Sequence, residues 1–164
     1  MGIVYNADEI FRMAIRIEED GAAFYRKAAK TQSAKKDKDL LEELAAMEDG
    51  HAATFKEMQG GLTKEEQEET VFDPHNEIGL YLNANADAHG GEGAPAVADS
   101  LTGKESMAEI VTTAIELEKK SILFYLGLKD FTPEHLGKDK VDHIIGEEKK
   151  HVAQLAGILA QQKS

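Results

Sequence analysis

The chain has 164 residues, a hydrophobic fraction of 41%, a formal net charge of -12 at pH 7 and no cysteine. This length and apolar content suit one domain with a buried core, and the lack of cysteine excludes disulfides, thiolate metal sites and iron–sulfur centres built by this chain. The negative charge opposes binding to nucleic acid and to anionic membranes. Because there is neither an apolar run that could cross a bilayer nor a secretion signal at the start, we expect a cytosolic protein.

Long helices are predicted in four places along the chain. Apolar residues recur at helical spacing over residues 8–31 and, after the polar break TQSAKKDKD, over residues 38–59, which two glycines follow. The same spacing returns over residues 104–131 and, after a Thr-Pro pair and a loop, over residues 139–162. Strand-period alternation is nowhere sustained. Helices joined by a short turn should lie antiparallel, so the four helices form two hairpins.

The segment between the hairpins, residues 60–103, has a different composition, with an acidic run and a stretch rich in glycine, alanine and proline. Within it, residues 76–88 carry apolar side chains that predict a short helix. We therefore expect one domain, residues 1–164, in which the hairpins 8–59 and 104–162 are joined by a long crossover connection. This is an all-α four-helix bundle.

The two hairpins resemble copies of one unit. The segment AIRIEEDGAAFY, which begins at Ala14, matches AIELEKKSILFY, which begins at Ala114, and the same offset aligns the second helix with the fourth. The repeat keeps apolar residues at core spacing together with a few polar ones on the same stripe of each helix. These polar residues are Glu18, Glu48, His51, Glu118, Glu148 and His151.

The spacing that is the same in both copies of the repeat places four carboxylates and two imidazoles in the bundle core. A buried charge without a partner costs several kcal/mol, and a domain is stable by only about 5–15 kcal/mol. Lysine and arginine are missing from these stripes, so metal ions must supply the positive charge. A Glu from each of two helices and Glu-x-x-His from each of the other two is a known di-metal ligand set. These ligands suit two iron ions, with manganese or zinc as alternatives.

Two adjacent glutamates precede His151, and the repeat selects one of them as the ligand. Glu148 corresponds to Glu48, whereas Glu147 corresponds to Met47. We therefore predict Glu148 as the ligand and exclude Glu147.

Two tyrosines are further candidates for the site. Tyr25 and Tyr125 lie seven residues after Glu18 and Glu118, two turns along the same helix face. Each hydroxyl could bind a ligand carboxylate and assist catalysis. The alternative is that the two rings only fill the core.

The paired segments AIRIEEDGAAFY with MEDGH, and AIELEKKSILFY with EEKKH, resemble the rubrerythrin branch of the ferritin-like superfamily. The resemblance covers both hairpins. It implies a ferritin-like fold and a non-haem di-iron site that reacts with peroxide or oxygen. Rubrerythrins typically append a rubredoxin domain with four cysteines, which this chain lacks, so the resemblance implies an external electron donor such as a separate rubredoxin or a flavoprotein.

A second departure from the family concerns Ser121. Peroxidases of this family usually carry an extra carboxylate three residues after the third-helix glutamate, and Ser121 occupies that place. The six-residue ligand set is therefore closer to that of ferritins and bacterioferritins.

The leading hypothesis is a di-iron oxidoreductase in which Glu48 and Glu148 bridge the metals. A ferroxidase or iron-handling protein is the alternative, and a structural bundle with an inert metal site is the second alternative. We also expect a homodimer, because a long connection can let hairpins exchange between chains.

Overall fold

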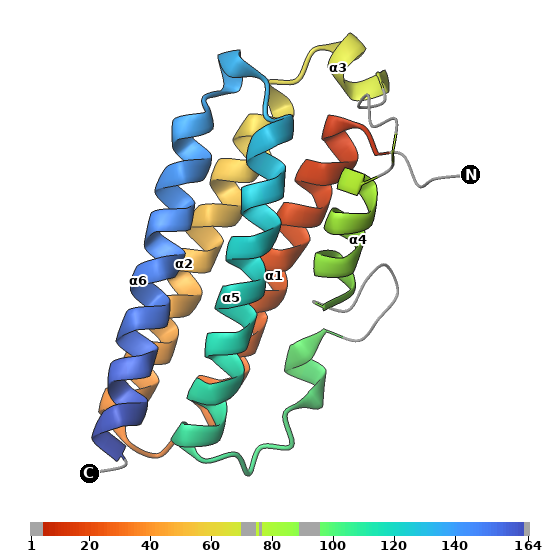
Figure 1. The fold of residues 1–164 in the computed structure, drawn as a ribbon. Helices are drawn as coiled ribbons and strands as arrows, with labels where there is room; N and C mark the ends of the chain where they lie inside the picture. Colours follow the sequence, from red (N-terminus) through yellow and green to blue (C-terminus); the bar gives the residue numbers. More distant parts are fainter. Residues whose placement is uncertain (1–4, 70–74, 76, 89–95, 163–164) are drawn as a thin grey trace.

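Four long helices, α1 (Ala7–Thr31), α2 (Lys35–Gly60), α5 (Met107–Phe131) and α6 (Lys138–Gln162), form a bundle in the computed structural model (Figure 1). The structure describes residues 5–69, 75, 77–88 and 96–162. Antiparallel helices α1 and α2 form one hairpin and α5 and α6 the other, with α1 packed on α5 and α2 on α6. The prediction of an all-α four-helix bundle is confirmed.

The described elements of the connection between the hairpins are spread along the length of the bundle (Figure 1). It contains α3 (Lys64–Glu68), α4 (Glu77–Ala88) and the 3-10 helix η1 (Val97–Ser100). Helix α4 packs against α5, and η1 packs against α1. The predicted helix in the connection is thus present as α4. Helix α3 was not predicted, and it is stabilised by a capping box in which Thr63 and Glu66 each bind the other's backbone N–H.

The sequence-based starts of the second and third helices are wrong by about one turn. Helix α2 begins at Lys35, in residues assigned to the polar break, and an ion pair from Lys35 to Asp39 spans this first turn. Helix α5 begins at Met107, because Ser106 and Glu109 form a capping box that sets its first turn. Gly103, with a φ of 85°, lies outside the helix.

The core consists of two apolar clusters that lie on either side of a polar layer. One cluster contains the side chains before Glu18 in α1 and after His51 in α2, including Phe11 and Phe55. The other contains the side chains after Glu18 and before Glu48, including Phe24 and Leu44. In α5 the side chains after Glu118 belong to the first cluster and those before it to the second, whereas α6 adds the side chains before Glu148 to the first and those after His151 to the second. This order follows from the antiparallel packing of neighbouring helices. The bundle therefore encloses the polar layer in an apolar surrounding.

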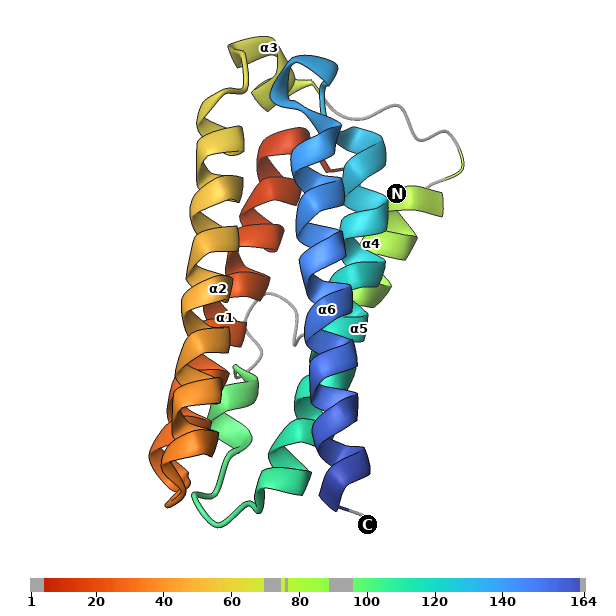
Figure 2. The same cartoon turned by 90° about the vertical axis from the view of Figure 1, so that its left-hand side faces the viewer.

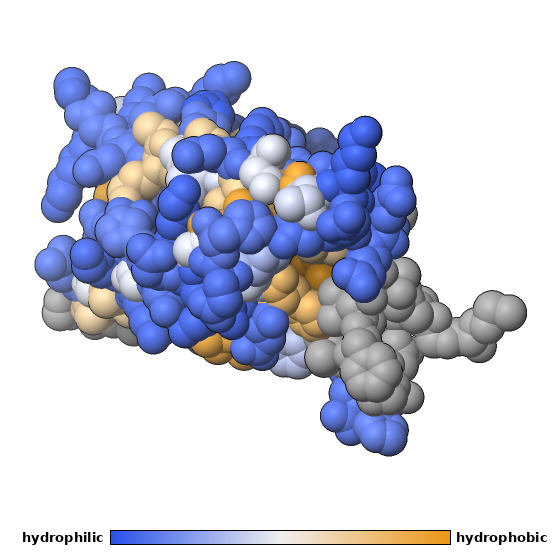
Figure 3. Space-filling view, turned by 90° about the horizontal axis from the view of Figure 1, so that it is seen from above, coloured by the Kyte–Doolittle hydropathy of each residue, from blue (hydrophilic) through white to orange (hydrophobic). Residues whose placement is uncertain are grey.

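The outer surface is mostly polar. Seen from the end at which α3 lies, hydrophilic side chains cover most of the molecule, with smaller apolar areas between them (Figure 3). Within the described part of the chain, no helix is both long and apolar enough to span a membrane.

Candidate metal centre

The polar layer in the middle of the bundle contains all six predicted metal-binding residues. Helices α1 and α5 each contribute one glutamate, and α2 and α6 each contribute a glutamate and a histidine one turn apart. All six are buried, with relative exposures between 0% and 4%. They are Glu18 in α1, Glu48 and His51 in α2, Glu118 in α5, and Glu148 and His151 in α6.

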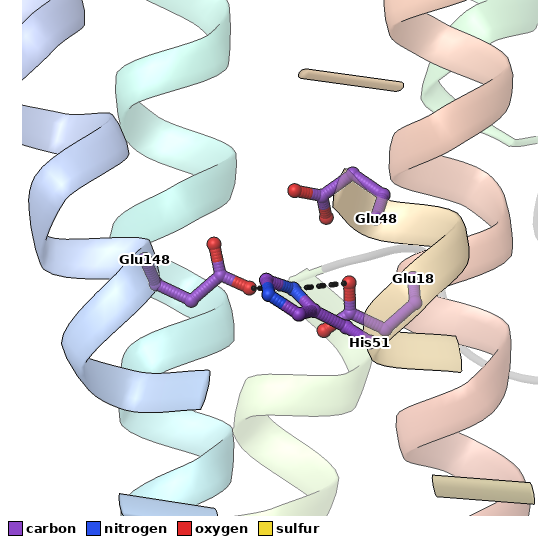
Figure 4. A group of neighbouring side chains, drawn as sticks. All are labelled: Glu18, Glu48, His51 and Glu148. Atoms are coloured by element: carbon purple, nitrogen blue, oxygen red, sulfur yellow. Dashed lines mark ion pairs between the residues drawn. The ribbon is translucent and has the colours of Figure 1, made fainter. Parts of the chain in front are cut away.

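These residues form two overlapping groups. In each group, one potential ligand atom per residue lies within 4.8 Å of the others. Glu48 and Glu148 belong to both groups. The first group adds Glu18 and His51 (Figure 4), and the second adds Glu118 and His151. Such an arrangement suits two neighbouring cations that share two carboxylates.

Both histidines point Nδ1 toward the carboxylates. His51 Nδ1 lies 3.4 Å from Glu18 Oε2 and 3.0 Å from Glu148 Oε1, as the dashed lines in Figure 4 mark. His151 Nδ1 lies 2.9 Å from Glu148 Oε2 and 3.5 Å from Glu48 Oε1. The two ring centroids are 6.0 Å apart, with 26° between the ring planes. One nitrogen of each imidazole is therefore directed at the place where the carboxylates converge.

Four buried polar atoms in this layer take part in no hydrogen bond. They are Glu18 Oε2, Glu48 Oε1, His51 Nδ1 and Glu148 Oε1. Their closest polar contacts are ion pairs within the cluster, such as His51 Nδ1 with Glu148 Oε1, and buried polar atoms without a hydrogen bond are rare in proteins. All four are good metal-ligand atoms, and the residues that carry them make up the first group. The donor set therefore fits oxygen- and imidazole-binding metal ions.

Burial and mutual repulsion dominate the acid–base properties of the carboxylates. Burial, together with the charge of Glu148, raises the pKa of Glu18 well above its usual value. Burial and the neighbouring carboxylates raise the pKa of Glu48 in the same direction, and burial raises that of Glu118 to about 7. Burial alone would also raise the pKa of Glu148, but contacts with the two histidines lower it to about 2.

In the histidines, burial and the neighbouring carboxylates shift the pKa in opposite directions. Burial by itself lowers the pKa of His51, but Glu148, Glu48 and Glu147 together outweigh it and raise the pKa to about 9. Burial also lowers the pKa of His151, and hydrogen bonds to Glu118 and Glu148 raise it to about 10. Without metal, the cluster thus holds protons at neutral pH. Metal binding must displace them, because imidazole and carboxylate bind metals in their deprotonated forms.

The two tyrosines connect the hairpins at the site. The Tyr25 hydroxyl donates a hydrogen bond to Glu118 Oε1, and the Tyr125 hydroxyl donates one to Glu18 Oε1. Each tyrosine therefore binds the glutamate of the other hairpin and not the one on its own helix. Burial raises the pKa of both tyrosines well above the usual value, so both hydroxyls are neutral donors. This contact supports a role in orienting carboxylates, and a part in catalysis stays a prediction.

A small cavity of about 20 Å³ borders the carboxylates on the side of α1 and α5. Its lining includes Glu48, Glu118 and the repeat-equivalent residues Gly21 and Ser121. A Cβ atom on Gly21 would lie 3.0 Å from Glu48 Oε2. Gly21 was not among the predicted site residues, although a glycine in the middle of a helix costs about 1 kcal/mol relative to alanine and is a usable signal.

Two contacts on the outer side of the histidines were also missed. Glu147 belongs to neither ligand group, but its Oε2 lies 2.9 Å from His51 Nε2. At the corresponding place, Met47 Sδ lies 3.3 Å from His151 Nε2. The repeat shows that residues 47 and 147 differ, but it does not indicate that each of them contacts a histidine of the other hairpin.

Comparison with known proteins identifies one matching family and one similar solved structure. The family model described as rubrerythrin matches residues 9–159. A crystal structure of a protein from Thermotoga maritima, assigned there as a ferritin-like diiron-carboxylate protein, superposes with a TM-score of 0.78 at 26% sequence identity. The alignment covers 99% of each chain. No curated protein sequence gives a significant match.

Proposed function

Since this chain belongs to the rubrerythrin family, we propose that it is a non-haem di-iron oxidoreductase that reacts with peroxide or dioxygen. The observation that carries the proposal is the pair of overlapping ligand groups, in which four buried ligand atoms make no hydrogen bond. The diiron-carboxylate assignment of the similar Thermotoga maritima protein favours iron over manganese or zinc.

The overlap between the groups supports a specific division of the ligands. Glu48 and Glu148, which belong to both groups, are the proposed bridging carboxylates. Glu18 and His51 would complete one position, and Glu118 and His151 the other. When bound, two ferrous ions supply two electrons for the reduction of peroxide or dioxygen.

The cavity beside the carboxylates suits a small oxidant. A water molecule needs about 10–15 Å³, so the cavity of about 20 Å³ beside Glu48 and Glu118 has room for a molecule of roughly that size. The apolar clusters on either side of the layer keep bulk water away from it. Tyr25 and Tyr125 hold the outer carboxylates in place through their hydroxyls. These features favour peroxide or dioxygen over an organic substrate.

The source of electrons and the assembly are part of the proposal. The chain has no cysteine with which to build a rubredoxin-type centre, so a separate rubredoxin or a flavoprotein in the cytosol would reduce the site. We further propose a homodimer, which sedimentation of the purified protein would test.

A ferroxidase is the second candidate, and Ser121 favours it. The Ser121 hydroxyl donates to the Leu117 carbonyl at 3.1 Å, and its side chain lines the small cavity where a further carboxylate would be needed for the peroxidase pattern. A ferroxidase would react faster with dioxygen than with peroxide and would accumulate many irons per assembly.

Rapid mixing of the ferrous protein with peroxide or with dioxygen tests both candidates. Faster oxidation by peroxide, at constant iron content, supports the oxidoreductase. Preference for dioxygen with iron accumulation supports the ferroxidase, and no oxidation by either would leave the inert structural bundle. Glu116→Gln is a suitable control, because Glu116 lies near Glu118 in sequence but is exposed and pairs with Lys119.

A further inference from the structure

The surroundings of the two histidines differ on the side that faces away from the carboxylates. Positions 47 and 147 are equivalent in the repeat, and each side chain contacts the histidine of the other hairpin. His51 Nε2 lies 2.9 Å from Glu147 Oε2, whereas His151 Nε2 lies 3.3 Å from Met47 Sδ. The six predicted ligands are the same residue types in both halves of the repeat, whereas the outer neighbours of the two histidines differ.

The orientation of the rings determines what this difference does. Both histidines direct Nδ1 at the carboxylates, so Nδ1 is the nitrogen available to a metal and Nε2 carries the outward proton. In His51 this proton is donated to a carboxylate, which makes Nδ1 a stronger ligand. In His151 it meets an uncharged thioether, which is a weak acceptor.

We propose that Glu147 makes the two metal positions unequal, so that the ion bound by His51 is held more tightly than the ion bound by His151. The inference rests on the proposed di-metal site. Glu147 is a positioning residue, since it would act on a bound metal only through the imidazole of His51. Outer carboxylates of this kind change metal affinity by about 10–100-fold. The His51 position should therefore fill first, and the His151 position should be the exchangeable one.

The location of Glu147 makes it accessible to substitution. Its side chain is 26% exposed and borders a groove of about 710 Å³ between α2 and α6, the helices nearest the viewer in Figure 2. The other oxygen of its carboxylate, Oε1, lies 3.5 Å from His143 Nε2, and the His143 side chain is 72% exposed. Replacing Glu147 therefore removes a contact at the edge of the site without opening a cavity in the core.

Anaerobic titration of the metal-free protein with Co²⁺, followed by visible absorption and calorimetry, tests the inference. The wild type should bind two ions in steps whose affinities differ by about 10–100-fold. Glu147→Met, which gives both histidines a thioether neighbour, should bring the two affinities together by weakening the first step. Glu147→Gln keeps an acceptor without the charge and should give an intermediate value.

The matched control is Glu57→Gln, because Glu57 lines the same groove but pairs with Lys140 instead of a histidine. It should leave both steps unchanged. Equal steps in the wild type, or a ratio of the two affinities that is the same in Glu147→Met as in the wild type, would overturn the inference while leaving the di-metal site intact. Absence of bound cobalt in the wild type would overturn the proposed site and this inference with it.

Discussion

Gly21→Ala should separate metal affinity from fold stability. Gly21 lies in the interior of α1, where alanine is favoured over glycine by about 0.5–1 kcal/mol. A Cβ atom at this position would lie 3.0 Å from Glu48 Oε2, whereas ordinary contacts begin at 3.4 Å. Glu48 must therefore move by a few tenths of an ångström. Because Glu48 belongs to both ligand groups, the displacement affects both proposed metal positions.

The expected result has opposite signs in the two forms of the protein. In the metal-free form Glu48 can move aside, so the helix preference should raise the unfolding free energy by about 0.5–1 kcal/mol and the melting temperature by about 2–4 °C at most. In the metal-bound form Glu48 is held, and we expect metal affinity to fall by about tenfold, or about 1.4 kcal/mol. Chemical denaturation and Co²⁺ titration measure the two quantities.

Gly50→Ala is the matched control, since Gly50 also lies within a long helix but a Cβ atom there would meet nothing within 4 Å. It should be stabilised without loss of metal affinity. The reasoning would be refuted if Gly21→Ala bound two metals as tightly as the wild type. It would also be refuted if Gly21→Ala lowered the stability of the metal-free protein while Gly50→Ala raised it.

Three further predictions follow from the site. Tyr25→Phe and Tyr125→Phe each remove one hydrogen bond to a buried carboxylate. Each should lower the unfolding free energy of the metal-loaded protein by about 1.5–3 kcal/mol. Losses below about 0.5 kcal/mol in denaturant titrations would mean that the rings only fill the core. Chelation should lower the melting temperature, because free metal at about 100 times its Kd contributes about 2.7 kcal/mol; an unchanged melting temperature in calorimetry would contradict the site. Metal affinity should rise with pH, because protons on the ligands compete with metal. The pKa values are about 7 for Glu118, about 9 for His51 and about 10 for His151. Metal uptake without proton release in weak buffer would contradict this prediction.

The bundle and the grouping of its polar residues could be predicted because both depend on short-range periodicity. Glu48 and His51 lie three residues apart on the stripe that also carries Leu44 and Phe55, so whatever buries the apolar residues also buries the polar ones. The repeat then places the same pattern on α6. Antiparallel packing brings the two stripes together without any need to know exact distances.

The contacts missed in the sequence depend on how the hairpins are rotated and shifted against each other. Glu147 reaches His51 across the α2–α6 interface, and Gly21 allows Glu48 to approach across the α1–α2 interface. No spacing along one helix determines such a contact. The early start of α2 was missed for a different reason: Lys35 and its neighbours are polar and exposed, so the apolar period does not include them.

Iron content after anaerobic reconstitution with Fe²⁺ tests the central claim most directly. Elemental analysis should find two irons per chain in the wild type and in the exposed control Glu116→Gln. Glu48→Ala and Glu148→Ala should each lose both irons, because each residue belongs to both ligand groups. Two irons per chain in either of these variants, or none in the wild type, would contradict the di-iron site.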